Sequence, residues 1–428
     1  MRSRGGRHHL HGGPSRRGFL TAAGGMAVTG IALAPFGETA AAATNPRNGI
    51  EPFHGPHQGG IATPQQTYSY FLALDLITPK RDEVVALLKR WTEMAAHLTQ
   101  GETAAPLIDN PAEPGTDSGE ALGLGPSRLT LTFGFGAGLF TKDGHDRYGL
   151  AAQRPAALVD LPRFPGDELV AGHSGGDLSV QACCDDPQVA FHAVRQLARA
   201  AAGAAQVRWS QTGSLPRPPD GKTPRNLMGF KDGTVNPSPR DPKDMGEAVW
   251  VGKEGPDWMQ GGSYVIARRI RMALEHWDRL KLGFQEQTFG RKKYSGAPLG
   301  QKHEFDPVDL NKTDKDGNPV IPETAHIRLA AATTNGGAQI LRRPYSYNDN
   351  INFIAERWPP WHQGLEYDAG LHFICYQRDP RTGFIKIFTR MSRLDMLNQF
   401  TTHVGSAVFA CPGGIARGEF VGQRLFTA

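Results

Sequence analysis

Cysteine is scarce in this 428-residue chain, which has only Cys183, Cys184, Cys375 and Cys411. No C-x-x-C occurs, which excludes a zinc knuckle and a thioredoxin-type redox pair, and the absence of C-x-x-C-H argues against covalent c-type haem. The H-E-x-x-H helix of zinc proteases is missing as well. A disulfide would be allowed outside the cell, but the sequence does not pair the cysteines. We favour buried free thiols.

Long apolar runs and an excess of charge in the body of the chain are also missing. The weakly apolar stretch at residues 21–36 is rich in Gly and Ala, and it is too polar for a stable membrane anchor of about 20 residues. The net charge is +5, of which +4 lies in residues 1–43, leaving about +1 for the rest. A near-neutral body gives no reason to expect a nucleic-acid partner.

The first 43 residues have the features of an export signal. Arg16 and Arg17 precede Phe19 and Leu20, a modest apolar stretch follows, and alanines fill residues 40–43. This pattern resembles a twin-arginine signal peptide. We therefore expect residues 1–43 to direct export to the cell envelope or the medium, with no stable membrane insertion.

Glycine and proline are plentiful, with 52 and 32 residues, which argues against a coiled coil or a helical bundle. After an extended arm at residues 44–66, strand-like and helix-like patterns alternate as β-α-β-β-α-β, the ferredoxin-like order. The predicted elements are strands at 67–77, 129–135, 178–183 and 206–210, and helices at 82–99 and 187–201.

The second half repeats the pattern less regularly. We predict strands at 263–272 and 326–331, a hairpin of 371–376 with 384–388, and helices at 275–284 and 391–400. The fold class expected is α+β, with two ferredoxin-like halves at residues 67–222 and 223–428.

Common nucleotide and hydrolase motifs fail on inspection. Gly221-Lys222-Thr223 ends like a phosphate loop, but Pro216 stands where its first glycine belongs. Residues 172–176 match G-x-S-x-G without the strand and helix that a nucleophile elbow needs. The glycines of residues 133–138 do not complete G-x-G-x-x-G, so a dinucleotide site is not expected.

Three segments carry residue types suited to chemistry. They are residues 229–236 (G-F-K-D-G-T-V-N), residues 326–329 (H-I-R-L) and residues 341–347 (L-R-R-P-Y-S-Y). Each alone has an ordinary explanation: a tight Asp-Gly turn, a structural histidine, and a solvated arginine pair. On the predicted strand, His326 and Arg328 would share one face.

The order of these segments is more informative than any one of them. Together with F-H-G-P-H-Q-G-G-I at 53–61, S-G-A-P-L-G at 295–300 and G-S-A-V-F-A-C-P at 405–412, they resemble the dye-decolourising peroxidase family, in particular its exported, twin-arginine branch. The resemblance covers nearly the whole chain after the leader. Pro344 departs from it, since that branch often has glycine there.

The resemblance implies one haem b per chain, held in the C-terminal half. His326 matches the proximal iron ligand, and Asp395 is a candidate for the acidic partner of its imidazole. Asp232 and Arg342 match the catalytic pair on the opposite, distal side, where one would move a proton and the other stabilise charge.

The same resemblance assigns pocket positions around the haem. Gly229 and Gly233 belong to the matched motif of the haem site. Leu371 and Phe373 would line the distal pocket and limit it to molecules of the size of peroxide.

The function implied is reduction of hydrogen peroxide through a ferryl intermediate, with small organic or metal-ion electron donors. Two alternatives stay open: a deferrochelatase that removes iron from haem, and an extracellular haem carrier. A carrier would need neither Asp232 nor Arg342. The sequence leaves the oligomeric state open, and an oligomer is compatible with it.

Overall fold

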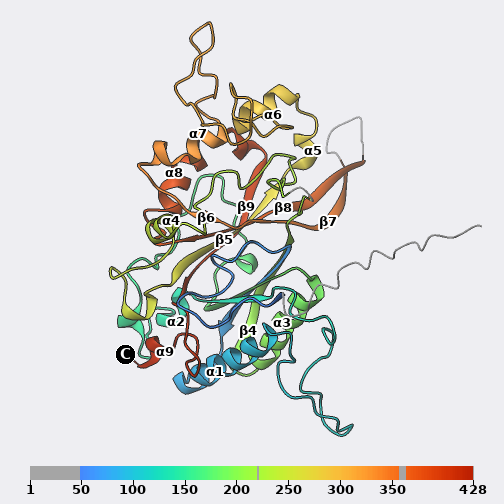
Figure 1. Ribbon diagram of the computed structural model, residues 1–428, viewed down its shortest axis with the longest axis vertical. Coiled ribbons are helices and arrows are strands. Elements are labelled where there is room, and N and C mark those ends of the chain that lie inside the picture. Colours follow the sequence, from blue (N-terminus) through green and yellow to red (C-terminus); the bar gives the residue numbers. More distant parts are fainter. Residues whose placement is uncertain (1–48, 219–220, 356–362, 428) are drawn as a thin grey trace, which may run out of the picture. The chain divides into compact units, whose positions relative to one another are not determined.

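The computed structural model describes residues 49–218, 221–355 and 363–427, and one nine-stranded antiparallel sheet runs through these residues (Figure 1). The sheet has two parts of the same strand order, joined by single-residue pairings, which we call the first and the second sheet. The leader, residues 1–43, lies outside the described residues. The first sheet and its helices comprise β1 (Tyr68–Leu76), α1 (Arg81–Leu98), β2 (Thr130–Phe135), α2 (Ala137–Phe140), β3 (Leu178–Cys184), α3 (Pro187–Ala200) and β4 (Ala205–Ser214).

The strand order of this first sheet is β2-β3-β1-β4, and every neighbouring pair is antiparallel. Two helices connect the strands across one face, α1 after β1 and α3 after β3. This arrangement is the ferredoxin-like fold predicted from the alternation of elements.

The second sheet has the order β9-β5-β8-β7, with β6 paired to β8 farther along that strand. It therefore repeats the order of the first. Its elements are α4 (Pro242–Ala248), β5 (Ser263–Met272), α5 (Leu274–Trp277), α6 (Leu282–Phe289), α7 (His326–Ala330), β6 (Leu341–Arg342), β7 (Tyr345–Ala355), β8 (Gln363–Gln377), α8 (Phe384–Leu394), β9 (Thr401–Cys411) and α9 (Gln423–Thr427).

The two sheets pack face to face and meet at both edges, where Phe135 pairs with Ala410 and Ser214 with Ser346. Phe71, Tyr376 and Phe409 are buried between them. Helices α1 and α3 cover the outer face of the first sheet, and α7 and α8 lie on the side of the second (Figure 1). All seven residues of β3 are buried, because both of its faces are covered.

Local sequence explains the two long helices of the first half. In α1, Val84, Leu88, Trp91 and Ala95 recur every three or four residues and are buried against the sheet. In α3, the carboxylate of Asp186 accepts hydrogen bonds from the backbone N–H groups of residues 188 and 189, which caps the helix.

Four predictions for the second half differ from the structure. Residues 326–331 were expected to form a strand, but His326 begins the helix α7, and the guanidinium of Arg328 binds the carbonyls of Leu310 and Ile321 instead of sharing a face with His326. An alternation of four residues is too short to specify a strand when no neighbouring strand pairs with it. The other three differences concern the segments that follow β5 and β8.

The predicted helix at 275–284 is two short helices, α5 and α6, on either side of residues 278–281. The predicted strand at 384–388 is the start of α8, and the predicted helix at 391–400 contains only the end of α8 and a 3-10 turn. The apolar spacing Phe384, Ile387, Phe388, Met391 is helical, and it places these side chains under the second sheet.

All four cysteines are buried, and none is joined in a disulfide. Burial raises the pKa of the Cys184 thiol to about 12, so it is not a reactive thiolate. Among the described residues, no helix is long and apolar enough to cross a membrane.

Candidate haem site

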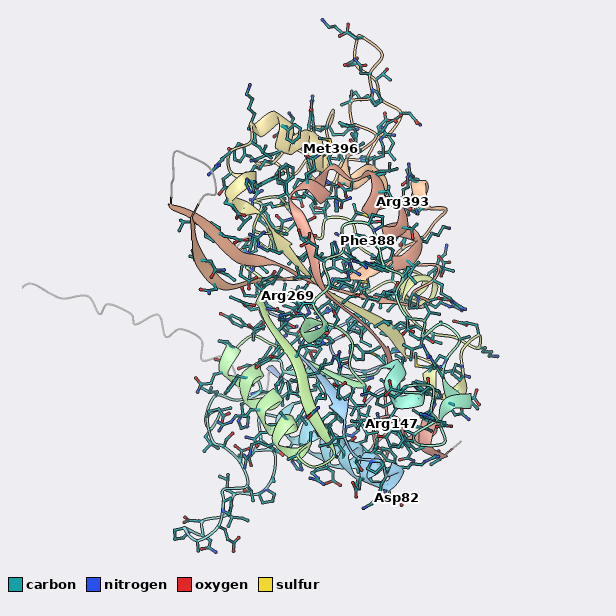
Figure 2. All side chains as sticks on the ribbon, turned by 180° about the vertical axis from the view of Figure 1, so that it is seen from behind. Asp82, Arg147, Arg269, Phe388, Arg393 and Met396 are labelled. Atoms are coloured by element: carbon teal, nitrogen blue, oxygen red, sulfur yellow. The ribbon has the colours of Figure 1, made fainter. Side chains whose placement is uncertain are left out.

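A cavity of about 600 Å³ lies between the second sheet and helices α7 and α8. Most of its wall area is apolar, and polar side chains from several loops and element ends also line it. The apolar walls include Ile270 and Met272 of β5, Leu371 and Phe373 of β8, and Ile387, Phe388 and Met391 of α8. Figure 2 labels Phe388 on α8, in this half of the molecule.

His326 lies at the first position of α7 and lines this cavity. Its Nδ1 is 2.7 Å from Oδ2 of Asp395, which directly follows α8. Burial alone would lower the pKa of His326, but the charge and hydrogen bond of Asp395 raise it above its ordinary value. Because Asp395 binds Nδ1, Nε2 is the nitrogen available to a metal.

The other oxygen of Asp395 accepts a hydrogen bond, 2.9 Å long, from the backbone N–H of Leu397. Its side chain is only 2 % exposed, so the carboxylate is fixed at both oxygens. Asp395, named above only as a candidate acidic partner, therefore does contact the imidazole of His326.

Asp232 and Arg342 form an ion pair on the cavity wall. Nη1 of Arg342 is 3.1 Å from Oδ1 of Asp232, and its Nη2 donates to the carbonyl of Val235 at 2.6 Å. The side chain of Arg342 is 26 % exposed and that of Asp232 is 18 % exposed. Both therefore keep polar atoms accessible from the cavity.

The side chain of Asn236 also holds Arg342, by binding the backbone of the arginine. The side-chain amide donates to the carbonyl of Arg342 at 3.0 Å and accepts from its N–H at 2.9 Å. Cys375 of β8 pairs with the other side of Arg342. The amide thus takes the place of a neighbouring strand at the free edge of β6.

The two motif glycines have different surroundings. Gly233 lines the cavity with φ of +108°, a backbone conformation that favours glycine between Asp232 and Thr234. Gly229 does not line it; its φ is +84°, and a Cβ there would lie 2.8 Å from the Lys293 side chain. Gly229 therefore shapes the turn rather than the cavity.

A second layer of contacts fixes the motif loop. Lys231 forms an ion pair with Glu304, and the hydroxyl of Thr234 donates to the same carboxylate at 3.0 Å. Sequence reasoning did not assign roles to Asn236 or Glu304. Asn236 lies inside the quoted motif, but Glu304 is about 70 residues away, and no local pattern marks it.

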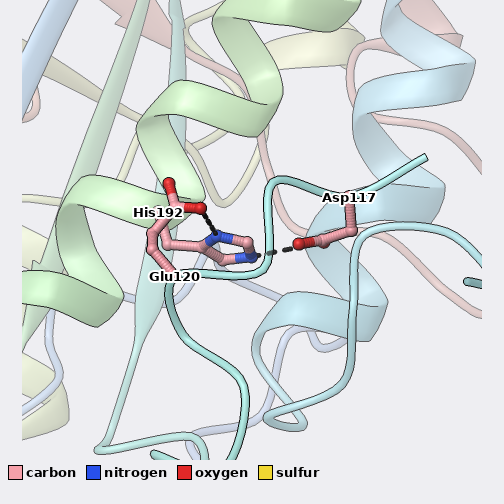
Figure 3. Close-up of side chains that lie close together, drawn as sticks. All are labelled: Asp117, Glu120 and His192. Atoms are coloured by element: carbon pink, nitrogen blue, oxygen red, sulfur yellow. Dashed lines mark ion pairs between the residues drawn. The ribbon is translucent and has the colours of Figure 1, made fainter. Parts of the chain in front are cut away.

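A possible metal cluster in the other half does not have the geometry of a cation site. Nε2 of His192 faces Asp117 at 3.3 Å and Nδ1 faces Glu120 at 3.2 Å, so the carboxylates flank opposite nitrogens (Figure 3). Burial opposes ionisation of Glu120, but hydrogen bonds from Ser118, its own backbone and His192 lower its pKa to about 2. The cluster fastens the loop before β2 to α3.

Known protein families match each half of the chain, and individual relatives match nearly all of it. The family model "Dyp-type peroxidase, N-terminal" matches residues 58–214, and "Dyp-type peroxidase, C-terminal" matches residues 223–416. The chain belongs to the Dyp-type peroxidase family. It is a haem-dependent enzyme that uses peroxide and reducing substrates.

Individual relatives cover nearly the whole chain. A dye-decolorizing peroxidase of Thermobifida fusca is 37% identical over 96% of this chain and 97% of its own length. A deferrochelatase of Escherichia coli K12 is 36% identical over the same shares. The crystal structure of a DyP-type peroxidase from Streptomyces coelicolor is 43% identical with a TM-score of 0.80, over 90% of this chain and 99% of that one.

The residues around the cavity fit a haem of this family. The cavity has the volume of a large planar cofactor, and apolar side chains face it from β5, β8 and α8. His326 offers an imidazole whose other nitrogen is held by a carboxylate, a common arrangement for a metal-binding histidine.

Proposed function

We propose that Asp232, Arg342 and His326 carry out the peroxidase reaction in this cavity. The observation that supports this most directly is that all three line one cavity, with Asp232 and Arg342 paired and His326 fixed by Asp395. Haem, when bound, supplies an iron that takes up the oxidising equivalents of peroxide. His326 would hold that iron through Nε2.

Asp232 would move the proton. Cleavage of the peroxide O–O bond with charge separation needs a proton to leave one oxygen and reach the other. A carboxylate within reach can accept it and return it, and Asp232 presents Oδ2 in addition to the oxygen bound to Arg342. Because Asp232 is an acid rather than a histidine, we expect best activity on the acidic side of neutrality.

Arg342 would stabilise the negative charge that develops on the peroxide. A guanidinium that is already oriented costs no reorganisation during the reaction. Two contacts fix the guanidinium, with the carboxylate of Asp232 and the carbonyl of Val235, and the amide of Asn236 holds the backbone of Arg342. We expect Arg342 to matter no less than Asp232.

Leu371 and Phe373 would restrict what reaches the catalytic pair. They occupy alternate positions of β8 and both line the cavity. Peroxide would pass, whereas bulky dyes would not. Small organic molecules and metal ions would therefore deliver electrons at the edge of the site.

The reaction can be tested on the purified holoprotein. Its absorption spectrum, taken before and after one equivalent of peroxide, should change within the mixing time and return when a small phenolic donor is added. Asp232→Asn should slow the first change. Asp244→Asn, at another position on the cavity wall, is the matched control and should not.

Iron release from haem is the second candidate function, favoured by the relatives named deferrochelatases. It would use the same cavity but leave the porphyrin intact without its iron. Incubating the protein with haem and a reductant, and assaying for free protoporphyrin, separates the two. A haem carrier is less well supported, since it needs no paired Asp232 and Arg342.

We also propose export by the twin-arginine route, to the cell envelope or outside the cell. The support is the Arg16-Arg17 leader, which lies outside the described residues. Fusion of residues 1–43 to a reporter that folds before transport would test it. Replacing both arginines by lysine should block its export.

A further inference from the structure

Arg291 is a buried cation without an acidic partner of its own. It follows α6 and the cap residue Gly290, lines the cavity, and is 7% exposed. Among the described residues it forms no ion pair. An unpaired charge at such a position is costly, because it loses its hydration.

Among the described residues, the guanidinium of Arg291 forms its hydrogen bonds through one nitrogen. Nη1 donates to the carbonyl of Gly296 at 2.7 Å and to the carbonyl of Glu304 at 3.0 Å. These two bonds use both hydrogens of Nη1. The edge formed by Nη2 and Nε keeps three N–H groups, in the geometry that binds a carboxylate with two parallel hydrogen bonds.

Three acids of the cavity wall and the neighbouring loop already have partners. The carboxylate of Glu304 binds Lys231 and Thr234, that of Asp232 binds Arg342, and that of Asp395 binds His326. Burial and the neighbouring charge of Arg342 lower the pKa of Arg291, and Glu304 offsets this in part. Both guanidinium groups line the same cavity. Arg342 is paired with Asp232, whereas Arg291 has no ion-pair partner among the described residues.

Haem b carries two carboxylates of its own, which need a cationic or polar partner in a cavity whose walls are mainly apolar. We propose that Arg291 binds one haem propionate through its Nη2–Nε edge, while the loop of residues 296–304 holds the guanidinium from behind. This rests on haem occupying the cavity as proposed above. It makes Arg291 a cofactor-binding residue, and it assigns the propionate edge of the haem to the side of the cavity that carries Arg342.

The test compares haem with its dimethyl ester, which has the same ring and iron but no carboxylates. Holoprotein is prepared with haem or with the ester. Excess apomyoglobin then captures the released haem or ester, and the rate of release is followed at the Soret band. In the native protein the ester should leave about 10- to 100-fold faster than haem, as expected for the loss of charge-assisted hydrogen bonds.

Arg291→Gln can still donate to the loop carbonyls but has no charge. It should release haem about 10- to 100-fold faster and the ester at an unchanged rate. Arg291→Lys should be intermediate for haem. Arg225 is the matched control, because it also binds carbonyls, those of Gly229, Lys293 and Tyr294, without lining the cavity. Arg225→Gln should change neither rate.

Three results would overturn the proposal. Haem release from Arg291→Gln could equal that of the native protein, haem and ester could be accelerated equally, or the variant could hold neither. The last two would show that Arg291 serves loop packing alone. Failure of the proposed function itself would appear differently, as haem retention that does not depend on His326.

Discussion

Asn236 and Arg342 exchange two hydrogen bonds, amide to carbonyl at 3.0 Å and backbone N–H to amide oxygen at 2.9 Å. The five-residue segment that supplies Asp232 therefore also fixes the backbone of its arginine partner. The distance between the two catalytic side chains is set within one short loop, and Lys231 and Thr234 fasten that loop to Glu304.

Asn236→Ala removes both of these bonds without touching either catalytic side chain. Arg342 should then sample orientations away from the peroxide, and the rate of reaction with peroxide should fall about 10- to 100-fold, as expected for a misplacement of about 1 Å. Haem content should not change. Stopped-flow absorbance of the holoprotein measures this rate, and an unchanged rate would show that Asp232 and Val235 suffice to hold Arg342.

Asp395→Asn should raise the reduction potential of the bound haem. The carboxylate makes the His326 imidazole electron-rich, which favours ferric iron, and the amide lacks this charge while it can still accept from Leu397. We expect a rise of roughly 60 mV or more, equivalent to a tenfold change in preference. Spectroelectrochemical titration measures it, with Asp379→Asn as control, a half-buried aspartate that pairs with Arg381 and does not line the cavity. A potential equal to that of the native protein would exclude this role.

His326→Ala should lose most of its haem on purification, or show a spectrum typical of another axial ligand. No other described histidine near the cavity has the same fixed geometry: Nδ1 of His403, which also lines it, accepts from buried Arg268. Haem content by pyridine haemochrome is the measurement. The exposed His145→Ala is the control. Full haem with a native Soret band would exclude His326 as the ligand.

His372 predicts a pH dependence of stability. It is fully buried between the sheets, neither ring nitrogen has a partner, and burial, together with the charge of Arg269, lowers its pKa to about 3. Its pKa is higher in the unfolded chain, so the unfolded state binds one more proton below about pH 6.5. Stability should fall as the pH drops from there to about 3.

His372→Leu should remove this contribution. Relative to the variant, the native protein should lose up to about 1.4 kcal/mol per pH unit across that window. Urea unfolding of both holoproteins at several pH values measures the difference, with His145→Gln as control. Parallel pH profiles for native protein and His372→Leu would show that His372 is not buried in its neutral form.

The sequence predicted the fold class because periodicity and turn residues agree over most elements. The alternating β-α-β-β-α-β pattern is strong in the first half, where α1 and α3 have regular apolar faces. It failed at His326, where four alternating residues imitate a strand, and at Phe384, where a short apolar run fits either period. Whether such a short segment forms a helix or a strand depends on the elements that pack against it.

The site was predictable where its chemistry lies in one motif. Residues 229–236 contain both Asp232 and Asn236, and the order of motifs pointed to His326 and Arg342. Glu304 and Arg291 could not be found in this way, because their roles depend on loops that fold back over the cavity. The spacing of residues in the sequence does not indicate such contacts. In the folded chain, Arg291 is noticeable because its buried charge has no ion-pair partner among the described residues.

The most direct test of the account is rapid mixing of Arg342→Leu holoprotein with peroxide. Leucine removes the charge but keeps an apolar side chain on the cavity wall, so the resting Soret band should match that of the native protein. The absorbance change on mixing should then be at least about 100-fold slower, as for loss of a fixed charge-stabilising donor. A rate equal to that of the native protein would contradict the assignment of this cavity as the peroxide site.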